Sequence, residues 1–160
     1  MATPDSLSAI PLWYRLFFLY IEPISTIVGA VYAQFYPFTY LQLTHARSAP
    51  ASTDAIPEGT RIVLSQLANL YFAFTLNEAL VLRTTSNIRV WKVLLLGLLI
   101  ADFGHIFTVH SLGVQIYWQF WTWNAIDWGN LGFVYLGALS RSCFILGVGL
   151  PTRQKSVKTR

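Results

Sequence analysis

Long apolar runs, separated by shorter polar segments, make up most of this 160-residue chain. A helix that crosses a bilayer needs about 20 consecutive, mostly apolar residues, and four of the runs are that long. They cover residues 12–36, 62–82, 90–110 and 129–150. The pattern predicts an all-α fold, a four-helix transmembrane bundle in which residues 1–160 form a single integral membrane domain.

The composition agrees with this interpretation. Hydrophobic residues make up 54% of the chain and charged residues only 11%, whereas a soluble globular domain has about 25% charged residues. The first run is too long for a secretory signal peptide and contains Glu22 followed by Pro23, so we expect a permanent helix there. The lipid bilayer is the expected surrounding of the folded chain.

Basic residues are distributed unevenly among the connections. Those expected on one face of the membrane are Arg15, Arg83, Arg89, Lys92, Arg153, Lys155, Lys158 and Arg160, and the first connection carries Arg47 and Arg61. The positive-inside rule then places both termini of a four-crossing chain in the cytosol. Because no cleavable leader is recognisable, this topology fits a multi-pass protein of the endoplasmic reticulum. The net charge of +4 is explained by the basic residues that determine this orientation. No nucleic-acid partner is expected.

The connections between the predicted helices differ in length. Residues 37–61 include Pro37, Pro50 and Pro57 and are expected to form a loop on the non-cytosolic side. Residues 84–87 are a short polar turn, and short turns join antiparallel neighbours. We therefore expect the second and third helices to pack as a hairpin.

The connection between the third and fourth helices is rich in tryptophan. It contains Trp118, Trp121 and Trp123, and Trp128 follows closely. Amphipathic rings at this density are typical of a segment at the membrane interface. The alternative is an aromatic lid or wall over a pocket that faces the lipid.

No metal or nucleotide site is recognisable in the sequence. The one cysteine, Cys143, cannot form an internal disulfide, and His45, His105 and His110 lack a second ligand at metal-binding spacing. Phosphate-binding and dinucleotide-binding glycine motifs are missing as well. We expect neither a metal nor a cofactor.

Five ionisable residues interrupt the apolar runs, namely Glu22, Glu78, Asp102, His105 and Arg141. Each is costly to hold in lipid, so each marks a candidate buried polar site. An unpaired guanidinium would be costlier than an ion pair, and Arg141 is therefore expected to pair with Glu22 or Glu78. Such a pair could also be purely structural.

Helical spacing groups the polar residues into faces. Gln66, Asn69 and Asn77 share a face of the second helix, Asp102 and His105 are adjacent on the third, and Asp127, Asn130 and Arg141 form a stripe on the fourth. We expect the three faces to converge on one elongated cavity. Its outer group would be Asp102, His105, Asp127 and Asn130, and its inner group Glu22, Glu78 and Arg141.

Asp102 and His105 are the first candidates for catalysis. A carboxylic acid shielded from water can remain protonated and donate that proton, and a histidine one turn away can accept or relay one. Glu78 and Asp127 are alternative acids. If the polar residues are instead satisfied pairs and interhelical hydrogen bonds, the protein is a non-catalytic lipid-binding or scaffold protein.

Four segments carry a resemblance to known proteins. They are Tyr14-Arg15-Leu16-Phe17-Phe18-Leu19-Tyr20-Ile21-Glu22-Pro23, Asn77-Glu78-Ala79-Leu80, Ala101-Asp102-Phe103-Gly104-His105 and Trp123-Asn124-Ala125-Ile126-Asp127-Trp128-Gly129-Asn130. In these the chain resembles a group of small fungal integral membrane proteins, most of which have no assigned function. In size, topology and scattered intramembrane acids it is similar to membrane-bound terpene cyclases of the ascofuranone and ascochlorin type.

The resemblance to cyclases implies a role in secondary metabolism. A partner monooxygenase would epoxidise a lipophilic terpenoid or polyketide-derived substrate, and this protein would open the epoxide and close a ring. Asp102, or else Glu78 or Asp127, would donate the proton, and His105 or a carboxylate would take up the surplus one. The side chains expected to bind the substrate are Glu22, Asn130, Trp123, Trp128, Tyr135 and Arg141.

A second enzyme class fits the same residues. Four-helix sterol isomerases of the emopamil-binding type are similar in size and use intramembrane acids and aromatic walls. The alternative reaction is therefore a proton-shuttling isomerisation.

Overall fold

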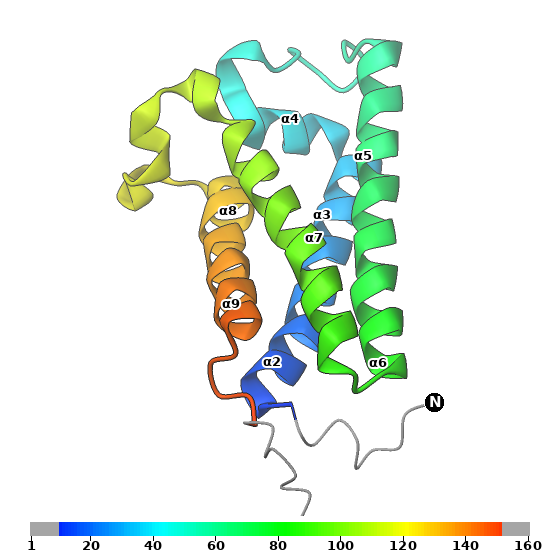
Figure 1. The fold of residues 1–160 in the computed structure, drawn as a ribbon. Coiled ribbons are helices and arrows are strands. Elements are labelled where there is room, and N and C mark those ends of the chain that lie inside the picture. Colours follow the sequence, from blue (N-terminus) through cyan, green and yellow to red (C-terminus); the bar gives the residue numbers. More distant parts are fainter. Residues whose placement is uncertain (1–9, 152–160) are drawn as a thin grey trace, which may run out of the picture.

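The computed structural model describes residues 10–151 and shows an all-helical protein, with no β-strand in that range. Four long helical stretches run alternately in opposite directions along a bundle, so that residues 10 and 151 lie at the same end (Figure 1). The basic residues from position 153 onward, on which the predicted orientation partly depends, lie outside the described residues. The cytosolic placement of the termini stays a prediction.

The first stretch consists of α2 (Leu12–Leu16), the π-helical turn η1 (Phe17–Ile21) and α3 (Glu22–Phe35). It is followed by α4 (Pro37–His45), where a loop was expected. Proline is tolerated at the first helical position because its missing amide hydrogen would have no partner there. The predicted loop is therefore shorter than expected, and α4 forms a cap across one end of the bundle (Figure 1).

The second stretch consists of α5 (Glu58–Leu76), the π-helical turn η3 (Asn77–Val81) and α6 (Leu82–Thr84). The third is α7 (Ile88–Phe107). Asn87 starts α7, because its side-chain oxygen accepts the backbone N–H of Arg89 at 2.9 Å.

The fourth stretch consists of α8 (Ala125–Asp127), the π-helical turn η7 (Trp128–Phe133) and α9 (Val134–Leu146). It ends four residues before the predicted limit because Gly147 adopts a left-handed conformation, with φ at +86°. Between α7 and α8 the chain forms only short 3-10 turns, at His110–Leu112, Val114–Tyr117 and Phe120–Thr122.

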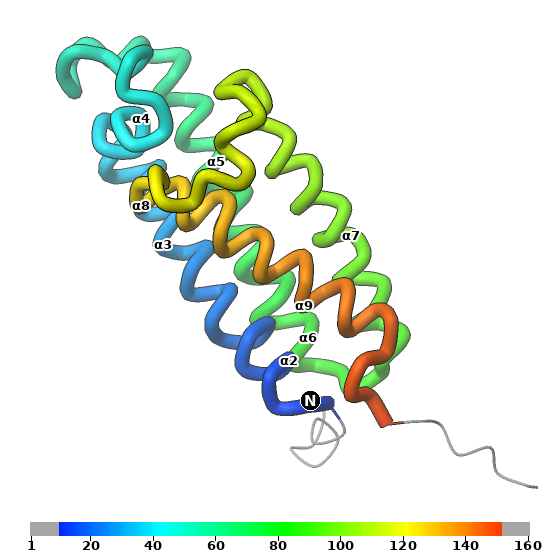
Figure 2. The backbone as a smooth tube through the Cα atoms, turned by 90° about the vertical axis from the view of Figure 1, so that its left-hand side faces the viewer, coloured from blue at the N-terminus to red at the C-terminus, as the bar shows by residue number. Residues whose placement is uncertain are grey.

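Within the described residues, three helices are long and apolar enough to cross a membrane, and not four as the hydrophobic pattern predicts. They are Leu12–Phe35, Ile88–Leu112 and Ala125–Leu146. The stretch of α5 is less apolar because amide and carboxyl side chains interrupt it between residues 66 and 78. The three helices indicate a membrane protein, and α5 packs along one of them, α3 (Figure 2).

The helices form two tightly packed pairs. One pair is α3 with α5, and the other is α7 with α9. The hairpin expected from the short turn between α6 and α7 is therefore not the main packing unit, because a short turn determines direction but not which faces meet. At the far end, α8 packs on α4 (Figure 2).

Two hydrophobic cores hold the pairs together. The larger lies at the end where the described chain begins and ends, and it contains the fully buried side chains of Phe17, Phe18, Trp91 and Phe144. The smaller lies near α4 and contains Ala33, Tyr40, Leu64 and Ala68. Between the two cores the bundle is hollow, and the cavity described next occupies this space.

Candidate functional site

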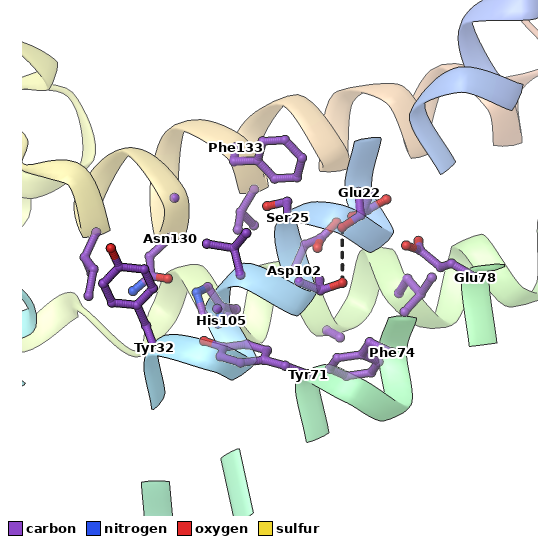
Figure 3. A pocket seen from close by; sticks show the side chains of 18 of the residues that line it. Glu22, Ser25, Tyr32, Tyr71, Phe74, Glu78, Asp102, His105, Asn130 and Phe133 are labelled. Atoms are coloured by element: carbon purple, nitrogen blue, oxygen red, sulfur yellow. Dashed lines mark hydrogen bonds between the residues drawn. The ribbon is translucent and has the colours of Figure 1, made fainter. Parts of the chain in front are cut away.

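A cavity of about 470 Å³ is lined by residues from all four helical stretches. This volume lies within the range of small-molecule sites, about 300–1,000 Å³. Most of the wall is apolar, and polar groups gather toward two ends (Figure 3). Six of the seven residues expected in one cavity do line it, all but Asp127, although the membership of its two groups differs from the prediction.

Arg141 organises the inner end of the cavity. Its Nη1 donates to Asp102 Oδ2 at 2.7 Å, and its Nη2 donates to Glu78 Oε1 at 3.1 Å and also to Glu22 Oε1. The expected pairing of Arg141 with Glu22 or Glu78 is confirmed for both. Asp102, which was assigned to the outer group, also belongs to this cluster. Four helical stretches are therefore joined by one guanidinium.

Gly137 makes this arrangement possible. Helical side chains point back toward the N-terminus of their helix, so the guanidinium of Arg141 lies over the residue one turn earlier. A Cβ atom on Gly137 would be 2.6 Å from Arg141 Nη1 and 3.4 Å from Glu22 Oε1. The missing side chain thus provides the space in which the cluster forms.

Three π-helical turns lie at the cavity. Glu22 follows η1, Glu78 lies within η3 and Asn130 lies within η7, and all three side chains line the cavity. A π-helical turn inserts one extra residue, so it rotates the residues before it relative to those after it, and such turns are frequent at functional sites. Sequence spacing at 3.6 residues per turn does not anticipate these rotations.

Pro23 also shapes the inner end. In an α-helix the carbonyl of Leu19 would accept the N–H of residue 23, which proline lacks. Arg83 replaces that donor, with Nη2 at 2.5 Å from the Leu19 oxygen. Its guanidinium also lies 4.7 Å from the centre of the Tyr20 ring. The position of Pro23 identifies the carbonyl that lacks a donor, whereas the residue that satisfies this carbonyl is known only from the structure.

The outer end of the cavity carries neutral hydrogen-bonding groups. The amide of Asn130 lies beside the imidazole of His105, with Tyr32 and Tyr71 nearby (Figure 3). The hydroxyl of Tyr71 is 3.2 Å from that of Tyr40. This end is therefore able to hold an uncharged oxygen-bearing group.

Asp127 lies outside the lining of the cavity. Its carboxylate accepts the backbone N–H of Asn124 at 3.0 Å, and the Asn124 side chain accepts the N–H of Asp127 at 3.0 Å. Together they form a capping box at the start of α8. Because η7 follows directly, Asp127 does not share one face with Asn130 and Arg141 as predicted.

The predicted aromatic wall lies elsewhere. Trp123 donates to the carbonyl of Ile116 at 2.8 Å, and Tyr135 donates to that of Tyr117 at 3.1 Å, so both tie down the aromatic connection. Trp128 is exposed. The aromatic side chains that line the cavity are Tyr32, Tyr40, Tyr71, Phe74 and Phe133. Sequence reasoning missed them because isolated aromatic residues in apolar helices are not distinctive.

The polar face of the second stretch does not converge on the cavity. Gln66, Asn69 and Asn77 are exposed on the outside of the bundle, whereas Glu78 is buried and lines the cavity. α5 contacts α3 through other residues, including Thr75, whose hydroxyl lies 2.7 Å from that of Thr26.

The site combines acidic side chains with a largely apolar cavity. In the part of the chain that the structure describes, no three His, Cys, Asp or Glu side chains are placed to hold a metal ion. What the cavity does offer is three carboxyl groups around one guanidinium, a histidine one helical turn from Asp102, and space for a lipophilic molecule.

Comparison with known protein families gives one match. Residues 7–151 match a family described as a domain of unknown function, DUF7704. No curated protein matches the chain, and no solved structure matches it either.

Proposed function

The chain belongs to the DUF7704 family, and from its cavity we propose that it is a membrane enzyme that isomerises a lipophilic substrate by acid–base chemistry. The specific reaction that we propose is the opening of an epoxide followed by ring closure, as in terpene cyclases. The observation that carries this proposal is the cluster of Glu22, Glu78 and Asp102 around Arg141 at the end of an apolar cavity.

The charges of the cluster favour a bound proton. One guanidinium can compensate one carboxylate, and further ionised carboxylates would remain uncompensated in a buried setting, at a cost of several kcal/mol each. Glu22 Oε2 and Glu78 Oε2 are both buried and have no hydrogen-bond partner among the described residues. Protonation of Glu78 or Asp102 would remove buried charge that the guanidinium leaves uncompensated.

Asp102 is the acid best placed to meet a substrate. Its side chain is 13% exposed, against 8% for Glu22 and 2% for Glu78. One oxygen, Oδ2, is held by Arg141, which leaves the other oxygen for the cavity. His105 lies one turn further along α7 and also lines the cavity.

The proposed reaction needs no net gain or loss of atoms. The neutral carboxyl of Asp102 transfers its proton to the epoxide oxygen, the C–O bond at the more substituted carbon breaks, and positive charge develops on that carbon. An alkene or hydroxyl group of the substrate attacks the carbon and closes the ring. An attacking hydroxyl group then loses its own proton, whereas attack by an alkene leaves a new cation, which loses a proton from an adjacent carbon. Either proton passes to His105 or returns to a carboxylate, and the faces of Phe74 and Phe133 stabilise the intermediate charge.

The two ends of the cavity suggest how the substrate lies. The reacting group would meet the acid cluster, and an oxygen-bearing head group would be hydrogen-bonded by His105, Asn130 and the tyrosine hydroxyls. Glu22 and Tyr32 are ten residues apart on α3, which corresponds to about 15 Å of helix. A prenylated phenol, or another long molecule with one polar end, fits this arrangement.

Proton shuttling without an epoxide is a second candidate, favoured by the same arrangement, in which Asp102 and His105 lie one helical turn apart and both line the cavity. An isomerase would add a proton at one carbon of an alkene and remove one at another. The two reactions differ in the substrate that they require, so a substrate panel distinguishes them.

The test compares microsomes that contain the wild type, Asp102→Asn, Asp127→Asn or Asp54→Asn, each supplied with an epoxidised prenyl-phenol. We expect a cyclic isomer of unchanged mass from the wild type and from the two control variants, and none from Asp102→Asn. Asp127 caps a helix and Asp54 is exposed in the loop before α5, so neither substitution should change the amount of product. Equal product from Asp102→Asn and wild type would refute the assigned proton donor.

A further inference from the structure

The outer face of α5 is unusual among the long helices of this bundle. Gln66, Asn69 and Asn77 are all exposed there, and none of their side chains makes a hydrogen bond to another described residue. By contrast, the side chains exposed along the middle of α7 and α9 are apolar, as for Val93, Ile100 and Leu139. Only α5, of the long helices that the structure describes, presents carboxamides outward along its length.

If α5 crosses the membrane beside α3, these carboxamides lie at membrane depth. α5 packs along α3, and α3 belongs to one of the three stretches that can cross the membrane. A carboxamide exposed to lipid has no water to bond, and leaving it unsatisfied costs free energy. The same groups lower the hydropathy of α5 below that of the other three stretches. A hydrogen-bonding partner outside the bundle would remove this cost.

The three residues also form one narrow stripe. At 3.6 residues per turn, positions 66, 69, 73 and 77 fall within about 80° of one another. The residue between the amides on this stripe is Ala73, whose small side chain allows another helix to approach closely. The stripe faces away from the side of α5 that contacts α3, on which Leu64, Ala68 and Thr75 are buried.

We propose that this stripe, formed by Gln66, Asn69, Ala73 and Asn77, is the interface through which two copies of the chain associate in the membrane. Two copies with the same membrane orientation are related by a two-fold axis along the membrane normal, so their α5 helices run parallel. Each carboxamide then meets its own copy at the same depth. Because a carboxamide both donates and accepts, each such pair is self-complementary.

This self-complementarity favours a second copy of the chain over an unrelated partner. A different transmembrane helix would need polar groups at three matching depths, whereas a two-fold axis supplies them automatically. A single asparagine pair at a helix interface can determine register and oligomeric state. The cavity lies on the opposite side of α5, where Tyr71, Phe74 and Glu78 line it. Association therefore leaves the proposed active site complete within each copy, and this proposal does not depend on the proposed reaction.

The test uses cysteine cross-linking in native membranes, in a Cys143→Ser background that removes the one natural thiol. Ala73→Cys places a thiol in the middle of the stripe, and Ile100→Cys places one on the exposed face of α7 as a matched control. A disulfide requires Cα atoms within about 7 Å of each other. We expect a covalent dimer from Ala73→Cys and none above background from Ile100→Cys.

Three further substitutions, Gln66→Leu, Asn69→Leu and Asn77→Leu, are then combined with Ala73→Cys. We expect the cross-link to be lost and the melting temperature of the monomer in detergent to be kept, because these side chains have no partner within the bundle. An Ala73→Cys signal no stronger than the Ile100→Cys signal overturns the proposal. A cross-link that survives the three leucine substitutions also overturns the proposal, because the carboxamides would then not hold the copies together.

Discussion

At the scale of single residues, Arg141 and Gly137 determine the geometry of the site. Arg141 is 3% exposed and bonds three acidic side chains, and Gly137 leaves the space that its guanidinium occupies. The sequence identified the charged members of the cluster through their cost in lipid. It did not identify Gly137, because a glycine in a transmembrane helix is common and its role depends on what lies over it.

Substitution of Gly137 tests this arrangement. Gly137→Val should displace the guanidinium and lower the free energy of unfolding by about 1–3 kcal/mol, as overpacking of a filled site does. Gly97→Val is the matched control, because nothing lies within 4 Å of a Cβ atom placed on Gly97. Unfolding in detergent micelles measures both changes. Equal effects would show that the loss is a general property of glycine in these helices.

At the scale of helices, π-helical turns and one proline decide which side chains face the cavity. η1, η3 and η7 each interrupt a long helix near a residue of the site, and the carbonyl that Pro23 leaves without a donor is bonded by Arg83. Helical periodicity predicted that Asp102 and His105 share a face, and both line the cavity. The same periodicity placed Asp127 on the wrong face, because the π-helical turn η7 follows that residue directly.

The link between Pro23 and Arg83 is open to a double-mutant cycle. Arg83→Gln should lower the free energy of unfolding by about 1–3 kcal/mol, because the Leu19 carbonyl loses its donor. The loss should shrink in a Pro23→Ala background, where residue 23 has an N–H of its own. Arg89→Gln, at an exposed position, is the control. If Arg83→Gln costs the same in both backgrounds, its effect is due to something other than this carbonyl, such as its contact with Tyr20.

At the scale of the whole molecule, two helix pairs enclose the cavity and both described ends lie at the same end of the bundle (Figure 1). Three stretches are apolar enough to cross a membrane, and the α5 stretch is the exception. If α5 crosses as well, the loop before it and the turn after it lie on opposite sides. If it does not, they lie on the same side.

Cysteine accessibility distinguishes these topologies. In the Cys143→Ser background, Asp54→Cys labels the loop before α5, and Thr84→Cys labels the end of α6; both positions are exposed. With both termini cytosolic, an impermeant maleimide added to sealed microsomes should modify Thr84→Cys at once and Asp54→Cys only after permeabilisation. The same response at both positions, whether both are modified or both are protected in sealed vesicles, would mean that α5 does not cross.

The sequence by itself determined the helical class, the approximate limits of the long helices and the identity of the costly polar residues. It could do so because apolar length and buried charge are local properties of the chain. Only the tertiary structure decided that Arg141 bonds Asp102 as well as both glutamates, that Asp127 caps a helix, and that the cavity is walled by tyrosine and phenylalanine. Those outcomes depend on helix rotation and on the pairing of helix faces, which are set by contacts between residues far apart in the chain.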